Sequence, residues 1–235
     1  MKKKVLGVIL CRSNSSRLKN KLKIKLYNTN IFTYFFKRLS YCKNIDEIII
    51  STTKNKNDDY FQTFAEKNNL HIYRGSQNNV FERVKNSINY LDNKFDIVIR
   101  CNADNPLIMP TIIDEDLNLF SKCDYDFFTP FYNNQIPFGF SFSIFKTKTL
   151  LNISETKLTN KQKEHIDNYF IDNSKKYKIL KRYNRKYFCP NLFLTLDTKF
   201  DLKRIKYFVN KIKNIQLKKQ PEKIIKIFQL MKSIY

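Results

Sequence analysis

The first half of the chain alternates short apolar runs with amphipathic stretches, and this alternation restricts the fold more than any other feature. The run VLGVILC at residues 5–11 is continuously apolar, as strands buried on both faces of a parallel sheet are. Further strands are predicted at 46–52, 71–75 and 96–102, and helices at 31–42, after Asp58 and Asp59, at 79–91 and after Pro110. A chain that alternates strand and helix in this way predicts an α/β fold with a mainly parallel sheet.

The second half is less regular, although it carries the same two kinds of element. Strands are expected at 125–130, 138–146, 177–183 and 191–198, and helices at 161–173, 202–212 and 221–233. No internal repeat and no linker rich in Pro, Gly or Ser divides the sequence. We therefore expect one domain over residues 1–235, with its core at about 4–210 and a terminal helix at 221–233.

Glycine is scarce, which limits how a nucleotide could be held. The chain has only three, Gly7, Gly75 and Gly139. Neither the dinucleotide-binding G-x-G-x-x-G loop nor a Walker A loop can be built from them. The loop RSNSSRLKNK at 12–21 follows the first strand and instead offers guanidinium and ammonium groups. Such groups pair with phosphate oxygens and would replace the backbone amides of a glycine loop.

Two carboxylates lie at the ends of predicted strands. Asp104 follows the strand at 96–102 and Asp197 ends the strand at 191–198. Ligands of parallel α/β sheets gather at the carboxyl ends of the strands, so both side chains are expected to face the loop at 12–21. Together they would hold Mg²⁺, which takes few protein ligands and completes its shell with phosphate and water. The D-x-D at 124–126 precedes its strand and is not favoured as the metal site.

The formal charge of +23 allows two readings. It could mark a polyanion partner, but the lysines are spread over the whole chain, as compositional drift in an A+T-rich genome would leave them. No specific nucleic acid is therefore expected. The five cysteines form no C-x-x-C pair and fit free thiols in a reducing compartment. The apolar runs are too short to cross a membrane, and we expect a cytoplasmic protein.

Five segments resemble motifs of a known family. CRSNSSRLKNK resembles A-R-x-x-S-x-R-L-P-x-K of the CMP-sugar synthetases, the cytidylyltransferases that activate acidic sugars. RCNADNPLIMP is similar to R-x-x-G-D-x-P-L-I-x-P, YRGSQNNVFERV to Y-R-G-S-x-x-x-V-L-x-R, KEHIDNYF to R-E-H-V-x-x-Y, and LTLDTKFDL to L-T-x-D-T-x-x-D-L. The segments keep the family's order over about residues 4–210. They are most similar to the spore-coat-polysaccharide cytidylyltransferase-like group, related to the 3-deoxy-manno-octulosonate cytidylyltransferases.

The resemblance implies a nucleotide-diphospho-sugar transferase fold, a Rossmann-like, three-layer α/β arrangement. It implies that CTP and a sugar acid give a CMP-sugar and pyrophosphate with Mg²⁺, for surface glycan biosynthesis, in an enzyme that commonly forms homodimers. Carried over by position, it implies that Arg12, Lys21 and Asp104 are catalytic and that Asp104 and Asp197 bind the metal. Nucleotide binding would fall to Arg12, Ser13, Asn14, Ser15, Arg17, Lys21, Arg74, Gly75, Ser76, Arg83 and Asn102, and acceptor binding to Gly139, Glu164 and His165.

Several positions depart from the family pattern. In the loop, Lys19 stands where the family has Pro and Asn14 where it often has Gly. Near Gly139 the family often reads P-D-G-x-D-x-E, and here Phe138, Ser141 and Ser143 replace the three acids. Two alternatives therefore stay open: a nucleotidyltransferase with a sugar-phosphate or phosphonate acceptor, and a basic nucleotide- or RNA-binding protein with little catalysis.

Overall fold

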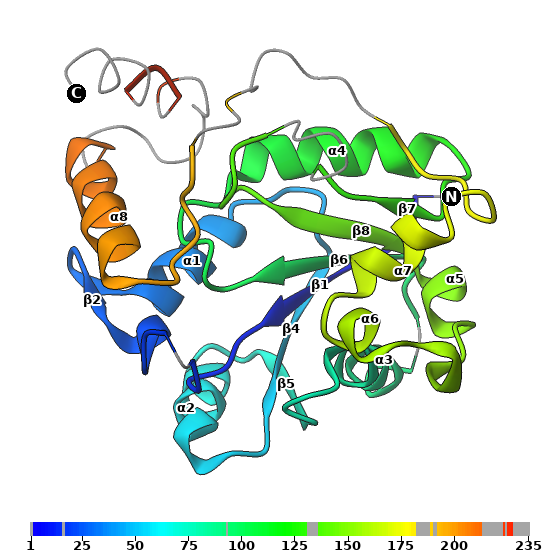
Figure 1. Ribbon diagram of the computed structural model, residues 1–235, viewed down its shortest axis with the longest axis horizontal. Helices are drawn as coiled ribbons and strands as arrows, with labels where there is room; N and C mark the ends of the chain where they lie inside the picture. Colours follow the sequence, from blue (N-terminus) through cyan, green and yellow to red (C-terminus); the bar gives the residue numbers. More distant parts are fainter. Residues whose placement is uncertain are drawn as a thin grey trace.

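A six-stranded sheet with strand order β5-β4-β1-β6-β8-β7 forms the centre of the molecule (Figure 1). The computed structural model describes residues 2–15, 17–92, 94–130, 136–181, 189, 192–212, 223 and 225–227. The strands are β1 (Val5–Leu10), β4 (Glu47–Thr53), β5 (His71–Gly75), β6 (Ile97–Asn102), β7 (Phe127–Phe128) and β8 (Phe142–Lys146). β1, β4, β5 and β6 run parallel, whereas β8 is antiparallel to both β6 and β7. The mainly parallel α/β fold is confirmed.

Helices follow most of the parallel strands. They are α1 (Ile31–Leu39), α2 (Asp59–Lys67), α3 (Val80–Asn89), α4 (Pro110–Lys122), α5 (Thr147–Leu151), α6 (Asn160–Glu164), α7 (Ile166–Asp172) and α8 (Lys199–Ile212). Asn30 and Asn79 cap α1 and α3, because each side chain accepts a backbone N–H from the first turn. Short elements that the sequence did not indicate are the hairpin of β2 (Lys25–Leu26) and β3 (Thr29–Asn30) and the 3₁₀ turns η1 (Lys21–Lys23), η2 (Lys56–Asp58) and η3 (Glu155–Lys157).

The sheet is buried on both faces, which explains the continuous apolar runs of its strands. On β1, Val5 and Ile9 point into one core and Leu6 and Val8 into the other. Helices α1, α2, α4 and α8 cover the first face, and α3, α5 and α7 cover the second. Within the described ranges, no helix combines the length and the apolar character needed to cross a bilayer.

The second half departs from the expected element boundaries. The strand expected at 138–146 begins only at Phe142, because Gly139 has φ +104° and turns the chain before it. The strand expected at 125–130 shrinks to β7. The helix expected at 161–173 is broken at His165, whose φ of −124° and ψ of 83° are not helical, so that α6 and α7 result.

Two further strands were predicted wrongly. The segment 177–183 contributes a single bridge, from Ile179 to Phe127, because β7 is too short to pair with more; its last two residues lie outside the described part. The segment 191–198 also forms one bridge, from Phe193 to Phe138, and residue 191 is not described. Its alternating leucines are buried, but its neighbours are loops rather than a strand. The helix expected at 221–233 lies almost wholly outside the described residues.

The strand order reverses next to β1, and this reversal determines where a ligand can bind. From β1 the chain moves to β4 and β5 on one side and then returns to β6 on the other. The loops that leave β1 and β6 at their carboxyl ends therefore diverge and leave a crevice between them. The loop at 12–21 follows β1 and Asp104 follows β6, so both predicted features meet there.

Candidate active site

A cavity of about 570 Å³ opens at the carboxyl ends of β1 and β6. Its lining joins the loop after β1, the start of α3, the end of β6, the break between α6 and α7, and the segment before α8. Eleven of the predicted site residues line it: Arg12, Asn14, Ser15, Arg17, Lys21, Arg83, Asn102, Asp104, Glu164, His165 and Asp197. Residues from separate regions of the sequence thus converge on one cavity, as the strand-end argument predicted.

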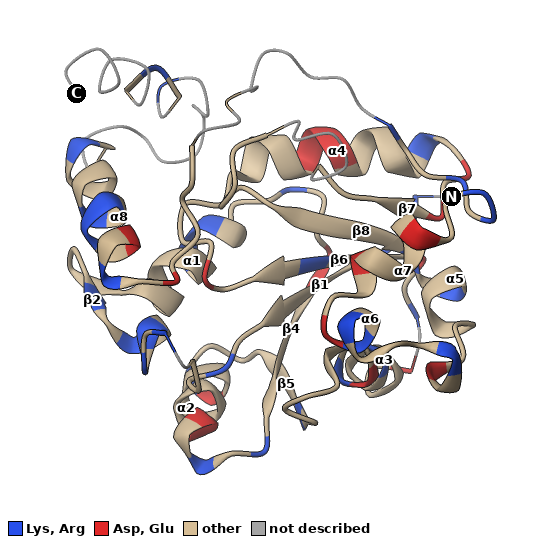
Figure 2. Cartoon of the chain, in the orientation of Figure 1, with Lys and Arg blue, Asp and Glu red and all other residues tan. Residues whose placement is uncertain are grey.

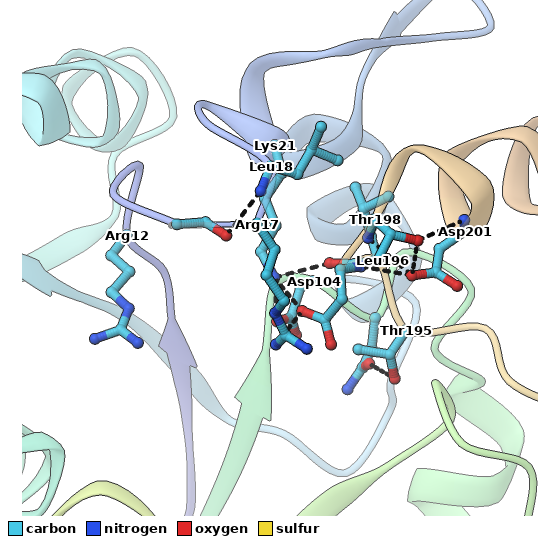
Figure 3. A network of polar contacts seen from close by, with 12 residues as sticks. Arg12, Arg17, Leu18, Lys21, Asp104, Thr195, Leu196, Thr198 and Asp201 are labelled. Carbon is cyan, nitrogen blue, oxygen red and sulfur yellow. Dashed lines mark hydrogen bonds and ion pairs between the residues drawn. The ribbon is translucent and has the colours of Figure 1, made fainter.

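Lys21 lies at the centre of the polar network on one wall (Figure 3). Its Nζ donates to Asp104 Oδ2 at 2.8 Å, to the Leu196 carbonyl oxygen at 2.8 Å and to Asp197 Oδ1 at 3.0 Å. The Lys21 side chain is only 10% exposed, whereas the two carboxylates are 26% and 27% exposed. A single buried ammonium therefore links the carboxylate that follows β6 with the carboxylate that precedes α8.

Two arginines of the same loop flank the cavity with partly exposed guanidinium groups. Arg17 Nη2 lies 3.0 Å from Asp197 Oδ1. Arg12 lies apart from this network in Figure 3, and it donates to the Gln77 carbonyl and to Glu164 Oε1, both at 3.3 Å. Because both side chains are substantially exposed, at 64% for Arg17 and 39% for Arg12, these ion pairs are weak and exchangeable.

Asp58 anchors the loop that carries these cations. Its carboxylate is fully buried at the start of α2. It accepts the Ser13 backbone N–H at 2.6 Å and the Thr53 hydroxyl, instead of capping its own helix. The Ser13 hydroxyl donates to the Asn57 carbonyl at 2.9 Å. Ser13 thus contributes to the site through the loop backbone, and Asp58 is a positioning residue that sequence reasoning interpreted only as a helix start.

We predict that Asp58→Ala lowers the free energy of unfolding by about 2 kcal/mol, because it leaves two buried donors without an acceptor. It should also weaken binding of CTP, the nucleotide that the sequence resemblance implies, by about fivefold, since Arg12 and Asn14 lose their backbone anchor. Asp58→Asn keeps an oxygen for the Ser13 N–H and should retain most of both properties. Urea denaturation and calorimetric CTP titration test this. A D58A variant that binds CTP as tightly as the wild type would contradict the positioning role.

The segment that carries Asp197 is held from both sides. The Leu196 N–H donates to the Asp104 carbonyl at 2.8 Å, which fixes this segment against the loop that follows β6. On the other side, Asp201 Oδ2 accepts the backbone N–H groups of Asp197 and Thr198 at 3.1 and 2.8 Å. Burial alone would raise the pKa of Asp201, but these hydrogen bonds and that of the Thr198 hydroxyl lower it below its ordinary value. Asp201 therefore stays ionised and secures the position of Asp197.

The wall formed by α3 combines apolar groups with a buried cation. Arg83 is 2% exposed and donates to the Ser76 carbonyl, and burial lowers the pKa of its guanidinium. Cys11 and Val80 also belong to the lining. Burial raises the pKa of the Cys11 thiol well above its usual range, so this cysteine is protonated and is not a nucleophile.

Arg100, which also lines the cavity, forms a buried ion pair that was not predicted. Arg100 on β6 donates through Nη2 to Asp167 Oδ2 at 2.7 Å and to the Ser143 hydroxyl at 3.1 Å. Ser143 is the residue opposite Arg100 in the β6–β8 register and itself donates to Asp167 at 2.8 Å. Asp167 on α7 thus gives the buried Arg100 guanidinium a charged partner.

Five predicted residues lie outside the lining, among the residues that the structure describes: Ser13, Arg74, Gly75, Ser76 and Gly139. Arg74 donates to the Thr53 and Asn55 carbonyls and pairs with Asp59, at the edge of the sheet. A side chain at Gly75 would meet the Tyr73 ring and the Arg83 stem. These residues shape the elements around the cavity, and their roles in binding stay predictions.

Sequence reasoning missed several lining residues: Leu10, Cys11, Leu22, Gln77, Val80 and Arg100. For Arg100 a signal existed, because an arginine inside the apolar strand DIVIRCN needs a buried partner or a ligand. For Gln77 none existed, since its carbonyl, rather than its side chain, meets Arg12. The D-x-D, which the sequence did not favour as the metal site, lies outside the cavity lining, and its Asp124 pairs with Lys146 and Lys178.

A crevice at the strand-order reversal, lined by loop cations, by the carboxylate that follows β6 and by the carboxylate that precedes α8, is the arrangement of a nucleotidyltransferase. The family model that describes cytidylyltransferases matches residues 6–233 of this chain. The chain belongs to the cytidylyltransferase family and is an enzyme of that class, related to the CMP-sugar synthetases. The resemblance seen in the five sequence segments is confirmed.

The chain is also similar to individual proteins in sequence and to solved structures in fold. The chain is 28% identical over 201 residues to protein MJ1063 of Methanocaldococcus jannaschii, covering 85% of this chain and 81% of that protein. It is 25% identical over 213 residues to the spore coat polysaccharide biosynthesis protein SpsF of Bacillus subtilis, covering 88% and 87%. Its fold matches a cytidylyltransferase structure from Leptospira borgpetersenii with TM-score 0.88 and 24% identity, over 100% and 96% of the two chains. It also matches CMP:2-keto-3-deoxy-manno-octonic acid synthetase complexed with CTP, with TM-score 0.66 and 15% identity, over 88% and 99%.

Proposed function

We propose that this enzyme transfers the CMP group of CTP to an acidic sugar in a Mg²⁺-dependent reaction that releases pyrophosphate. The product would be a CMP-activated sugar for a surface glycan, made in the cytoplasm. The observation that carries the proposal is the Lys21 ammonium held between Asp104 and Asp197 at the edge of the cavity. The polysaccharide role of the relative SpsF and the CTP complex of the structural neighbour support the substrate classes.

The loop after β1 offers the charge that a triphosphate needs. Arg12, Arg17 and Lys21 all line the cavity, and each is paired with a carboxylate. Phosphate oxygens would replace the carboxylates as the partners of these cations, because one guanidinium group can bind two phosphate oxygens at once. When an acceptor oxygen attacks the α-phosphorus, negative charge grows on the phosphoryl oxygens and on the departing pyrophosphate. Cations fixed beside those atoms stabilise that charge.

The oxygens around Lys21 also fit a divalent cation. Two carboxylate oxygens and one carbonyl oxygen converge on a single positive charge, and an all-oxygen set of this kind suits Mg²⁺. In the described part of the chain, no group of three or more His, Cys, Asp or Glu side chains suits a metal. Asp104 and Asp197 would therefore share the ion with phosphate and water. Bound there, Mg²⁺ would neutralise charge on the phosphates.

The acceptor would bind at the wall made by Glu164, His165 and Arg100. Glu164 in this wall accepts a hydrogen bond from the Arg12 guanidinium. The positions where the family's three acids are replaced, Phe138, Ser141 and Ser143, are not among the described lining residues. Their replacement therefore gives no reason to prefer a phosphate acceptor. Lys and Arg residues are distributed over many helices, strands and loops of the chain rather than gathered on one element (Figure 2), which does not favour a dedicated RNA-binding segment.

Pyrophosphate release tests the proposal. Each of the four ribonucleoside triphosphates is combined with a panel of sugar acids and with sugar phosphates, in Mg²⁺ and in EDTA. We expect release with CTP and at least one sugar acid in Mg²⁺ only. Release that requires a sugar phosphate would move the acceptor class to the alternative. CTP that neither binds nor reacts would refute the proposal.

A further inference from the structure

The Lys21 ammonium occupies the position that a divalent cation would take between Asp104 and Asp197. We infer that Lys21 is a resident counter-ion: it fills the cation position while no nucleotide is bound and leaves it when the triphosphate binds, so that metal entry depends on nucleotide. This inference rests on the proposed triphosphate site. It gives Lys21 a second role beside phosphate binding.

The hydrogen-bond count of the ammonium carries the first step. A lysine ammonium has three N–H donors and no acceptor. All three are used, by Asp104 Oδ2, the Leu196 carbonyl and Asp197 Oδ1 at 2.8 to 3.0 Å. In this position Lys21 has no donor left for a phosphate oxygen. Binding a triphosphate through Lys21 therefore requires it to give up at least one of these oxygens.

The local fold lets the side chain move without moving the loop. Leu22, the next residue in η1, is 2% exposed and packs in the core, which fixes the backbone at this point. The charge of Lys21 lies at the end of a flexible four-carbon stem. The three oxygens that the ammonium contacts belong to two other regions, the end of β6 and the segment before α8. The ammonium can thus turn towards the cavity while its partners stay in place.

Charge determines which group replaces the ammonium when it leaves. Asp104 and Asp197 would then face each other. Among the described ion pairs, the one that remains to them is that between Asp197 and the exposed Arg17. Two carboxylates this close favour a cation between them. The departure of Lys21 thus creates the metal site, and by linkage each ligand raises the affinity for the other. Before that departure, Mg²⁺ must displace a buried ammonium that is held by three oxygens.

Mn²⁺ binding to the nucleotide-free protein tests the inference directly. Free Mn²⁺ is measured by electron paramagnetic resonance during titration of the wild type, Lys21→Met, the double variant K21M/D104N and Lys19→Met. We expect K21M to bind one Mn²⁺ at least about tenfold more tightly than the wild type, within the range typical of coupled sites. The double variant should lose this gain. Lys19→Met removes the same charge from an exposed position of the same loop and should match the wild type.

Two results would overturn the inference. Equal Mn²⁺ affinity of the wild type and K21M would show that Lys21 does not block the site. The absence of tight binding to K21M would show that the carboxylate pair is not a metal site that Lys21 fills. Lys21→Gln, compared with K21M by circular dichroism, separates this outcome from misfolding. No CTP or acceptor is present, so failure of the pyrophosphate assay would refute the proposed function without deciding the Mn²⁺ result.

Discussion

Replacing Asp104 by Asn is expected to lower kcat for CTP-dependent pyrophosphate release by about 10³-fold. Asp104 is one of two carboxylates that hold the Lys21 ammonium, and an amide can neither balance that charge nor bind a divalent cation as well. The loss of one electrostatic contact at a reacting phosphate costs on the order of 10²–10³ in rate. If Asp104 also binds the metal, as proposed, the loss of that ligand would add to the cost. Steady-state pyrophosphate release in Mg²⁺ measures the effect.

Asp124→Asn provides the matched control for this substitution. Asp124 is also an aspartate paired with lysine, at 2.5 Å from Lys146 Nζ, but it lies on the exposed D-x-D outside the cavity lining. D124N should leave kcat within twofold of the wild type. D104N should in addition unfold at nearly the wild-type urea concentration, because the Asp104 side chain is partly exposed. A D104N enzyme with near-normal kcat would contradict the assignment of the reacting centre.

Gly139→Ala is expected to destabilise the protein by about 3 kcal/mol. Gly139 has φ +104°, a conformation that costs a residue with a Cβ about 1–2 kcal/mol. An added Cβ would also lie 2.5 Å from the Leu194 carbonyl carbon, and such overpacking costs about 1–3 kcal/mol. Because Leu194 leads into Leu196 and Asp197, the remaining folded protein should also bind CTP less tightly. Urea denaturation and CTP titration measure the two effects.

Gly7→Ala is the control for this second prediction. Gly7 lies in β1, and the nearest atom that its added Cβ would meet belongs to the Ile45 side chain, at 3.0 Å. A side chain can give way by a few tenths of an ångström, and alanine lowers the entropy of the unfolded chain. G7A should therefore change the free energy of unfolding by less than about 1 kcal/mol. If G139A were as stable as G7A, the close approach between Gly139 and Leu194 would not exist as described.

The parallel half of the fold could be predicted because its strands are buried on both faces. The helices between these strands begin at polar residues such as Asn30 and Asn79, whose side chains do cap α1 and α3. The second half could not be predicted at the same level. The alternating leucines of 191–198 look like a strand, yet their backbone partners are the loop at Asp104 and the turn at Phe138. Only the tertiary arrangement decides whether such a segment has a strand beside it.

The site was predictable where chemistry depends on residue type and strand end. Arg12, Lys21 and Asp104 come together as the strand order requires, and Asp197 joins them although its segment is not a strand. The supporting residues were not predictable, because their roles depend on backbone contacts between distant segments. Asp58 holds the Ser13 amide across 45 positions of sequence, and Asp167 on α7 pairs with Arg100 on β6. Neither pairing leaves a local motif.

Following the phosphates of CTP is the most direct test of the proposed transfer of CMP to an acceptor. CTP labelled with ³²P at the α- or the γ-position is incubated with the enzyme, Mg²⁺ and the sugar acid that supports pyrophosphate release, and the products are separated. We expect the α-label in an acceptor-linked CMP product and the γ-label in pyrophosphate. D104N should form neither product. An α-label that appears only in free CMP, or a γ-label released as orthophosphate, would contradict the proposed transfer.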